Sequence, residues 1–381
     1  MCGVESCPSQ TCRDSEMQAA LTRIADRIRA AANGGGLRLR GGGTKDFYGG
    51  PLEGETLDLR EYAGVVSYEP TELVVTARCG TPLAELEAAL AARNQMIPFE
   101  PPHYGAGATV GGCIAAGLSG PRRAANGLYC GAVRDYVLGC TLMDGRGEVM
   151  RFGGQVMKNV AGYDVSRLVA GSMGTLGVIL EVSLKVLPVP VACATLRFSM
   201  AEAEAIARLN EWGGQPLPVS ASAWRAEQLT VRLEGASAAV DAACAKLGGK
   251  RIEEALAVDF WQGVREQVDP FFAQSGELWR LSVPSTTAPI ALAGSQLIEW
   301  GGALRWWKTG TDAAAVRSAA KGGGGHATLF RGGGRSAGVF TPLDPVLARL
   351  HRNVKAVFDP AGVFNRSRLY PQWRSRAGPP R

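Results

Sequence analysis

The sequence predicts an α+β fold in two domains, and three observations lead to this prediction. Segments with the apolar spacing of amphipathic helices alternate along the chain with short apolar runs typical of strands. The chain has 381 residues, 46% of them hydrophobic and 20% charged, which is enough apolar material for two cores. Pro188 and Pro190 follow a long strand-like run and mark the boundary between the domains.

The first domain is predicted to open with a helix that Asp14 or Ser15 caps and that residues 34–36, all glycine, terminate. Its apolar positions share one face: Met17, Leu21, Ile24 and Ile28. A strand is expected over 73–77, followed by a helix with Thr81 as its cap. Two later runs are predicted as strands: YVLGCTLM and GVILEVSLKVLPVP.

The second domain is predicted as helices alternating with strands. MAEAEAIARLNEW and SAAVDAACAKLGG have amphipathic helical spacing, and LTVRLEG is a strand candidate between them. The glycine-rich run KGGGGHATLFRGGG, residues 321–334, is expected to form a surface loop, with an active-site lid as the alternative. The chain closes with a helix, a turn and a tail rich in proline and arginine that we expect to be disordered.

Charge and composition exclude several classes of protein. The net charge is +6, from 41 Lys and Arg against 35 Asp and Glu, but the basic residues are scattered. No nucleic-acid groove is indicated, and a mild preference for anionic ligands is all that follows. No apolar run is long enough to cross a bilayer, and the first residues lack the pattern of a secretory signal. We therefore expect a cytoplasmic location.

The cysteines favour reduced thiols. Nine is an odd number, and they are spread over a long chain, which does not suit a disulfide framework. Cys2, Cys7 and Cys12 are evenly spaced in a polar segment, without the close spacing common in metal and cluster sites. We expect no metal site.

Three runs of small residues are the strongest functional signal. The first, RGGGTK, places three glycines and a hydroxyl where backbone N–H groups can converge on an anion. It lacks the spacing of a Rossmann fingerprint and the ending of a Walker loop. Two further runs cover residues 105–123 and 170–182. Three such runs in under half the chain indicate one long ligand in a backbone-lined channel, as a dinucleotide would be.

The order of these motifs resembles a known family. RGGGTKDFYG, TVGGCIAAGLSGPRR, RDYVLG and KNVAGYDVSRLVAGSMGTLGVILEVSLKVLP are similar to the FAD-binding domain of the vanillyl-alcohol oxidase and p-cresol methylhydroxylase (PCMH) superfamily. Within it, KNVAGYD, WGGALRWW and FDPAGVFN most resemble the FAD-binding subunits of bacterial glycolate oxidase. The resemblance runs from about Leu37 to Tyr370. It implies a PCMH-type two-part FAD-binding domain with a second α+β cap domain over the flavin ring.

The resemblance also implies a domain plan. A disordered segment over 1–14 would precede the FAD-binding domain over 15–190 and the cap or substrate domain over 191–354. Residues 355–372 would return to the flavin domain, and 373–381 would form a disordered tail.

Cofactor contacts follow from the same resemblance. One side of the pyrophosphate would be bound by Gly41, Gly42, Gly43, Thr44 and Lys45. The other side would be bound by Thr109, Val110, Gly111 and Gly112. The flavin or ribityl chain would pass Gly117, Ser119 and Gly120, and the adenine end would contact Gly177 and Val178. Asn365 would lie near the flavin ring, although NRSR departs from the usual turn sequence and puts the geometry at Arg366 and Ser367 in question.

The implied function is that of an FAD-binding subunit in a glycolate oxidase complex, with FAD held non-covalently. Electrons would pass from glycolate or D-lactate through flavin to an iron–sulfur subunit, beside a larger flavoprotein homologue in the same complex. Membrane contact would be peripheral at most, through these partners. A structural subunit with a relay flavin and an independent FAD-dependent 2-hydroxy acid dehydrogenase are the alternatives. His326 as base and Arg331 as carboxylate clamp are the candidate catalytic pair, since 2-hydroxy acid oxidation requires both roles.

Overall fold

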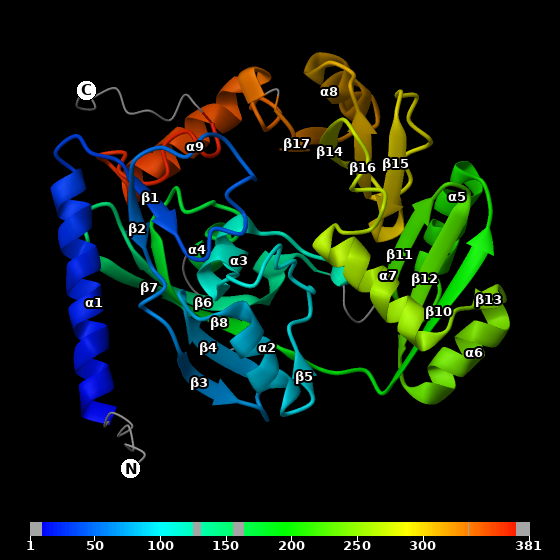
Figure 1. Ribbon diagram of the computed structural model, residues 1–381, viewed down its shortest axis with the longest axis horizontal. Coiled ribbons are helices and arrows are strands. Elements are labelled where there is room, and N and C mark those ends of the chain that lie inside the picture. The colour runs from blue at the N-terminus through cyan, green and yellow to red at the C-terminus, as the bar shows by residue number, and fades with distance from the viewer. Residues whose placement is uncertain (1–9, 125–130, 155–163, 334, 371–381) are drawn as a thin grey trace, which may run out of the picture.

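The computed structural model describes residues 10–124, 131–154, 164–333 and 335–370, and its mixture of helices and sheets confirms the α+β prediction (Figure 1). Two large sheets lie side by side in the view. The first, with the helices around it, is built from the chain up to β9 together with the C-terminal helix α9. We call this the first domain, and the part from β10 to β17 the second domain.

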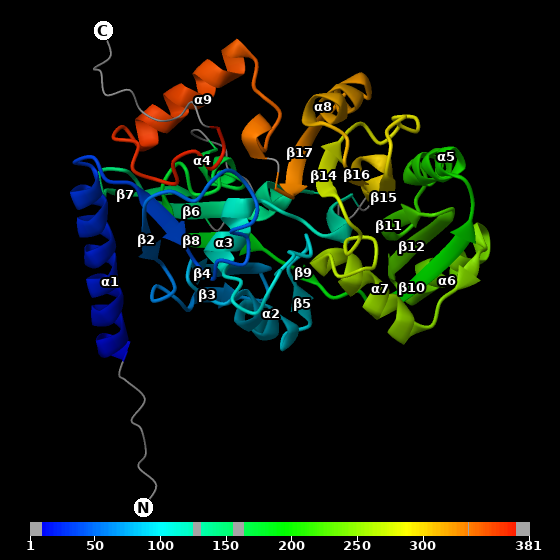
Figure 2. The same ribbon diagram turned by 45° about the horizontal axis from the view of Figure 1, so that its top comes forward.

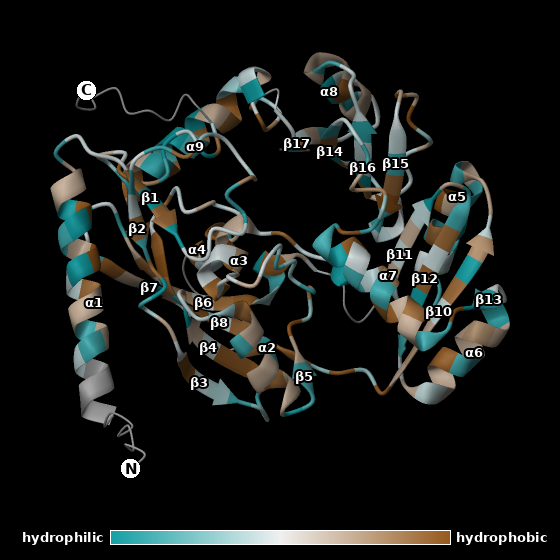
Figure 3. Ribbon diagram, in the orientation of Figure 1, coloured by the Kyte–Doolittle hydropathy of each residue, from teal (hydrophilic) through white to brown (hydrophobic). Residues whose placement is uncertain are grey.

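The first domain contains a five-stranded antiparallel sheet in the order β3-β4-β8-β6-β7. Its strands are β3 (Val65–Glu69), β4 (Val74–Arg78), β6 (Val137–Met143), β7 (Val149–Gly153) and β8 (Val178–Lys185). Figure 3 shows that the hydrophobic residues of this domain are concentrated on the strands. One face packs against α2 (Leu83–Ala91) and α3 (Val110–Ala116). The other packs against α1 (Gln10–Ala31) and the parallel pair of β1 (Leu37–Arg40) and β2 (Glu55–Asp58).

A short pair of strands and a short helix complete the first domain. The strand β5 (Gln95–Met96) pairs with β9 (Leu187–Pro188), and α4 covers Val165–Leu168. Among the described residues, no helix has both the length and the apolar character needed to span a membrane.

Local signals at the helix starts were only partly right. The α1 helix starts at Gln10, before the predicted cap at Asp14 or Ser15 and inside the segment expected to be disordered, of which residues 1–9 lie outside the described part. Thr81 does not cap α2, which begins after Pro82. Its hydroxyl instead accepts from the N–H of Gly64 and donates to the carbonyl of the same residue, so it joins two loops.

The second domain is one eight-stranded sheet in the order β13-β10-β12-β11-β15-β16-β14-β17. Its strands are β10 (Ala192–Ser199), β11 (Val219–Arg225), β12 (Gln228–Gly235), β13 (Lys250–Arg251), β14 (Glu277–Ser282), β15 (Ser295–Glu299), β16 (Leu304–Thr309) and β17 (His326–Arg331). Its helices are α5 (Glu202–Gly213), α6 (Ser237–Leu247), α7 (Glu254–Glu266) and α8 (Ala313–Gly322). Part of the glycine-rich run over 321–334, expected to be a surface loop, therefore forms β17, which pairs with β14 at the edge of the sheet.

Alternation along the strands gives this sheet two apolar faces. Trp279 and Leu329 belong to a cluster with Val316 of α8. Leu278 and Phe330, their neighbours in sequence, belong to another cluster that includes residues of the first domain. The second domain thus packs one face of its sheet against its own helix and the other against the first domain.

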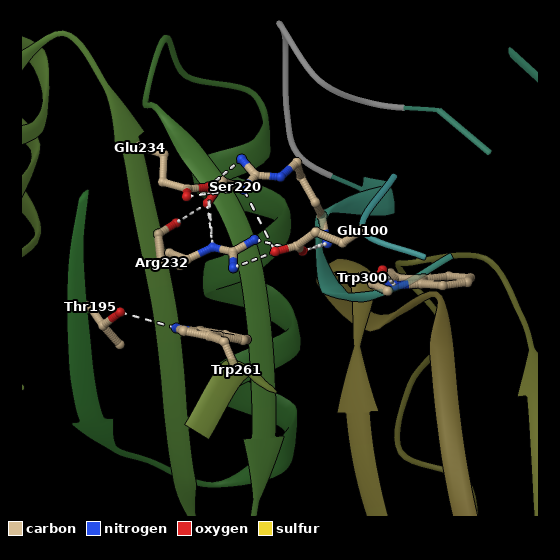
Figure 4. A network of polar contacts seen from close by, with 9 residues as sticks. Glu100, Thr195, Ser220, Arg232, Glu234, Trp261 and Trp300 are labelled. Carbon is tan, nitrogen blue, oxygen red and sulfur yellow. Dashed lines mark hydrogen bonds and ion pairs between the residues drawn. The ribbon is translucent and has the colours of Figure 1, made fainter. Parts of the chain in front are cut away.

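Four buried charges join the two domains (Figure 4). Glu100 accepts hydrogen bonds from both terminal nitrogens of Arg232 on β12, each at 2.8 Å. Arg122, from the short helix Pro121–Ala124, donates to Glu234 on β12 at 2.5 and 3.1 Å. Because each domain contributes one positive and one negative side chain, the four charges of this network pair with one another across the boundary.

The chain end returns to the first domain. After α9 (Pro345–Phe358), the N–H of Leu37 donates to the carbonyl of Val363, and Leu37 bridges Phe364 in parallel. Figures 1 and 2 both show α9 and the segment after it lying along β1. Residues from opposite ends of the chain therefore meet beside the glycine-rich loop.

Candidate cofactor site

A cleft in the first domain brings the three runs of small residues together. It encloses about 850 Å³ of empty volume, its open mouth included. The walls come from the loop after β1, from the start of α3, from the loop before β8 and from the C-terminal turn. The lining residues used below are Gly41, Gly42, Gly43, Thr44, Lys45, Cys79, Thr109, Gly111, Gly112, Met173, Gly174, Gly177, Asn365 and Arg368.

The loop after β1 is the anion cradle of this cleft. Among the described residues, the backbone N–H groups of residues 41–45 donate to no protein acceptor. Buried or half-buried N–H groups seldom remain unpaired, and consecutive ones form concave sites that bind anions. Gly43 has a φ of +72°, a left-handed conformation that glycine adopts without strain. The donor set fits a pyrophosphate.

Lys45 adds a desolvated cation to the same loop. Its Nζ lies 3.3 Å from the carbonyl oxygen of His103 and 3.5 Å from Thr44 Oγ1, and it forms no ion pair within the described chain. Burial lowers the pKa of Lys45, an effect that the negative groups around it only partly oppose. A buried ammonium group without a carboxylate partner is stabilised by an anionic ligand.

The second predicted cradle is built differently from the expectation. Thr109 caps α3, and its Oγ1 accepts from the N–H of Gly112 at 3.2 Å. The N–H groups of Val110 and Gly111 donate to the carbonyls of Thr81 and Cys79. Since these three N–H groups are already used inside the protein, the start of α3 contributes shape to the cleft rather than backbone donors.

Glycine is needed around the cleft for two different physical reasons. A Cβ at Gly42 would overlap the carbonyl oxygen of Gly107, and one at Gly111 would lie 2.6 Å from the Cβ of Cys79. These two glycines permit close packing of loops. A Cβ at Gly112 would meet only Thr109 Oγ1, at 3.1 Å, and would otherwise enter the cleft. Gly112 is therefore the position where glycine leaves room for a ligand.

The C-terminal turn closes the cleft from the other side. Asn365 accepts from the N–H of Leu39 at 2.8 Å and donates to the carbonyl of Met173 at 2.6 Å, so its amide joins two walls. The turn is formed despite its unusual sequence, with φ of +41° at Asn365 and +64° at Ser367. Both values lie in the left-handed region.

Arg368 is a lining residue that the sequence did not reveal. Its guanidinium group donates to the carbonyls of Asp46, Gly50 and Tyr48, and so fixes the loop that follows the anion cradle. Burial lowers the pKa of Arg368 to about 10, against the opposing effect of Asp46. The sequence signal that could have identified Arg368 is its place three residues after Asn365, next to the FDPAGVFN motif.

Five of the residues implied by the resemblance do not line the cleft. Val110 and Val178 are fully buried in apolar clusters. Gly117 ends α3 with a left-handed φ of +63° and packs against the backbone of Gly171. The carbonyl of Gly120 accepts from the indole of Trp300. Ser119 Oγ is buried and has no hydrogen-bond partner among the described residues, so it alone of the five retains an unused polar atom.

The structure separates the candidate catalytic pair. His326 and Arg331 stand at opposite ends of β17, and five residues of strand span about 16 Å. Arg331 lies over the ring of Phe47 at 3.7 Å and near that of Tyr104 at 5.1 Å. Burial, with a smaller effect of Arg280, lowers the pKa of His326. The strand places the two residues at its opposite ends rather than side by side, and their roles as base and carboxylate clamp stay a prediction.

The other histidines lie away from the cleft wall as well. His103 Nε2 contacts a carboxylate oxygen of Glu87 at 2.9 Å, and its backbone N–H donates to Glu266. His351 lies in α9 with its ring 6.1 Å from that of Tyr370. Among the described lining residues there is no histidine.

Arg280 is a cation that sequence reasoning missed. It lies on β14, half-buried and 5.3 Å from the ring of Trp300, and its charge acts on Tyr48, Tyr104 and Glu299. Burial raises the pKa of both tyrosines, so neither serves as a base at neutral pH. No group of metal-ligating side chains occurs in the part of the chain that the structure describes.

Comparison with known proteins agrees with this geometry. A model of the FAD binding domain family matches residues 20–153. Glycolate oxidase subunit GlcE of Escherichia coli (strain K12) is 50% identical over 334 residues, 88% of this chain and 92% of that relative. Glycolate oxidase subunit GlcD of Bacillus subtilis (strain 168) is 34% identical over 160 residues, which cover 41% of this chain and 33% of GlcD. A D-lactate dehydrogenase of Archaeoglobus fulgidus is 35% identical over 156 residues, 39% of this chain and 33% of that protein.

A solved structure confirms the expected fold. Alkyldihydroxyacetonephosphate synthase superposes with a TM-score of 0.62 at 14% identity, covering 90% of this chain and 74% of that one. The PCMH-type arrangement of a two-part FAD-binding domain and an α+β cap is therefore shared.

Proposed function

This chain belongs to the family of the glycolate oxidase subunit GlcE, and from that membership we infer that it is the FAD-binding subunit of a glycolate-oxidising complex. The resemblance found in the sequence is confirmed. The observation that supports cofactor binding most directly is the loop over 41–45, with five unpaired backbone N–H groups and the desolvated ammonium of Lys45. This donor set suits the pyrophosphate of FAD.

The remaining lining residues have positioning roles in this proposal. Asn365 and Arg368 hold the loop after β1 and the loop before β8 in place, and Gly112 leaves space along the ligand. Ser119 does not line the cleft, but its Oγ has no hydrogen-bond partner among the described residues, and we propose that it serves the ribityl chain or the flavin. When bound, FAD supplies the conversion between two-electron oxidation of a 2-hydroxy acid and one-electron transfer.

We propose that the cofactor is held without a covalent bond. Attachment to flavin requires a nucleophilic side chain, and the described wall of the cleft offers no histidine. Cys79 lines the cleft, but burial raises the pKa of its thiol to about 12, so the reactive thiolate is absent at neutral pH.

The partners we propose are a larger flavoprotein homologue and an iron–sulfur subunit. The relatives GlcE and GlcD are each named as a glycolate oxidase subunit, and this supports an assembly with more than one flavoprotein chain. The iron–sulfur subunit follows from the need for a one-electron acceptor after flavin. A cytoplasmic location is supported by the free thiols at Cys79, Cys113, Cys140, Cys193 and Cys244.

We further propose that substrate turnover depends on the complex. The chain offers no histidine at the described cleft wall, and His326 lies about 16 Å along β17 from Arg331. Phe47, Tyr104 and Phe330 pack edge to face in the space between the cleft and the second domain. Among the described residues, no histidine therefore stands at the cleft wall to serve as the base that oxidation of a 2-hydroxy acid requires.

One observation favours the alternative of independent activity. Arg280 and Arg331 both lie near Tyr104, where two guanidinium groups would bind a carboxylate. The relatives named D-lactate dehydrogenase act on such an acid. Independent activity would also require a base; Glu299, on which the charge of Arg280 acts, has a pKa that burial raises to about 8, so it is protonated at neutral pH and does not supply one.

The function is tested by reconstituting the complex with and without this chain. Glycolate-dependent dye reduction is expected only when the chain is present and loaded with FAD. The Lys45→Met variant is expected to lose FAD affinity by about tenfold or more, since a hydrogen bond to a charged group contributes about 1.5–3 kcal/mol. The control Lys321→Met, at the exposed end of α8, should bind FAD normally. Full activity of a complex that lacks this chain would refute the proposal.

A further inference from the structure

The outer face of α9 carries apolar side chains. Leu347, Leu350 and Val357 are 45%, 51% and 64% exposed, and Val346 beside them is 57% exposed. With half-buried Val354, the spacing of three, four and three residues places them in one stripe along the helix. A 14-residue helix is about 21 Å long, so the stripe extends over most of that length.

The inner face of α9 fixes this orientation. Lys355 is buried and donates to the carbonyls of Thr175 and Phe364 at 2.6 and 3.0 Å, and it forms an ion pair with Asp359. A lysine is almost never fully buried unless it is paired. These contacts of Lys355 fix the rotation of α9 about its own axis. The apolar stripe, on the side away from Lys355, therefore faces outward.

The exposed charges of α9 are of one sign. Arg349 lies three residues after Val346 and so beside the stripe, whereas Arg352 lies four residues after Ala348 and three before Lys355, next to the buried face. Arg349 and Arg352 are exposed, and α9 contains no Asp or Glu between Pro345 and Phe358. Its outer face has no aromatic residue, because Phe358 is buried. Helices that lie in a membrane interface typically carry Trp, Phe or Leu on the apolar face and Lys or Arg on the polar face, and α9 buries its one lysine. The composition therefore favours a protein partner over a lipid surface.

We propose that α9 is the docking helix of this chain for another subunit of the oxidase, on a surface that is apolar and flanked by carboxylates. The proposal rests on the proposed function, since it takes the chain to be a subunit of a complex. Charge complementarity selects the partner, because a carboxylate on its rim would pair with Arg349 while the stripe loses its contact with water. An apolar patch of this kind on a soluble chain marks an interaction site.

The helix α9 is connected to the walls of the cofactor cleft. The helix leads directly into the turn that carries Asn365 and Arg368, and Lys355 bonds to Thr175 in the loop between Met173 and Gly177. A subunit bound to α9 would lie near the cleft walls that these residues form, since α9 lies beside β1 (Figure 1) and the loop after β1 lines the cleft. Such a position suits transfer of electrons between subunits.

The test is co-expression of the full chain with the two proposed partners, a larger flavoprotein homologue and an iron–sulfur subunit, followed by purification through a tag on this chain. The double variant Leu350→Glu with Val357→Glu is expected to lower the amount of co-purified partner at least tenfold, with FAD content and thermal unfolding unchanged. The matched control is Leu256→Glu with Val258→Glu on α7, at 59% and 56% exposure, which should co-purify normally. Arg349→Glu with Arg352→Glu should weaken association most at low salt.

Several results would overturn the proposal. Undiminished co-purification of the Leu350→Glu, Val357→Glu protein would show that α9 is not the docking helix, while the function itself would stand. Self-association of the purified chain that this variant abolishes would assign the stripe to a second copy. Binding to phosphatidylglycerol vesicles, abolished by the variant while subunit association persists, would assign it to a membrane. A wild-type chain that binds FAD but no other subunit would contradict the proposed function as well.

Discussion

Glu100 and Arg232 form a bidentate ion pair across the boundary between the two domains, with two hydrogen bonds of 2.8 Å. Burial alone would raise the pKa of Glu100, but the attraction of Arg232 and Arg122 outweighs it and holds the pKa at about 2. Arg232 also donates to Ser220 through Nε at 2.9 Å (Figure 4). The pair fixes the second domain over the first at a position beside the aromatic cluster that includes Tyr48 and Phe330.

Replacement of Arg232 by Met is expected to destabilise the chain strongly. Glu100 would keep only Arg122, at 3.6 Å, as a partner for its buried charge. Removing one partner of a buried ion pair costs about 3–5 kcal/mol. Urea unfolding of the FAD-loaded chain measures this loss. The control is Arg208→Met on α5, whose ion pairs with Glu204 and Glu211 are about half exposed, and it should cost less than about 1 kcal/mol. Equal costs for the two variants would contradict this account.

Glu299 is expected to make stability fall as the pH rises. Burial raises its pKa to about 8, while its hydrogen bond from Trp306 acts in the opposite direction. The folded state therefore holds a proton that the unfolded chain releases near its ordinary pKa of 4.5. Between these two values the free energy of unfolding declines by about 1.4 kcal/mol per pH unit.

The Glu299→Gln variant isolates this effect, because it keeps an oxygen that accepts from Trp306 Nε1 and does not titrate. Urea unfolding at a series of pH values should show the variant gaining on the wild-type chain from about pH 5 to about pH 8. A constant difference between the two proteins over that range would show that Glu299 is ionised in the folded state.

Gly112→Val is expected to abolish FAD binding and leave the fold intact. Its side chain would enter the cleft and meet only Thr109 Oγ1. The matched control is Gly322→Val at the end of α8, where a Cβ meets nothing within 4 Å. Flavin absorbance per chain after purification and the far-ultraviolet circular dichroism spectrum give the two readouts. A Gly112→Val protein with one FAD per chain would show that the ligand does not pass the start of α3.

Acid precipitation is expected to release all the flavin. No histidine lines the described cleft wall, and the Cys79 thiol remains protonated at neutral pH. The yellow colour should stay in the supernatant after trichloroacetic acid treatment. Colour in the pellet that disappears in a Cys79→Ala or His103→Ala variant would identify a covalent attachment.

The sequence predicted the elements with strong periodicity and the cofactor loop. It did not predict which backbone N–H groups of the loops are bonded to other loops and which are left for a ligand. The helix with Ile24 and Ile28 on its buried face was visible in the apolar spacing, and a helix was also expected near the C-terminal end, where α9 lies. The anion cradle over 41–45 was visible because three glycines and a lysine stand together. The start of α3 looked equivalent, yet the carbonyls of Thr81 and Cys79 occupy its N–H groups, and these come from a segment about 30 residues earlier.

The site residues that sequence reasoning missed depend on tertiary contacts. Arg368 binds carbonyls about 320 residues away in the chain, and no local pattern encodes such a pairing. His326 and Arg331 looked like a pair because they are five residues apart inside a glycine-rich run. Strand formation, which the sheet partner β14 imposes on that run, places them at opposite ends instead.

The central claim is that this chain binds FAD but oxidises a 2-hydroxy acid only within a complex. Its most direct test is anaerobic mixing of the purified, FAD-loaded chain with glycolate and then with D-lactate, while the visible band of oxidised flavin is followed. The account predicts that the band bleaches slowly or not at all, and that bleaching becomes rapid when the partner subunits are added. Rapid bleaching of the chain alone, abolished by Arg280→Met or by His326→Ala with Arg331→Met, would contradict the account and make this chain a catalytic dehydrogenase in its own right.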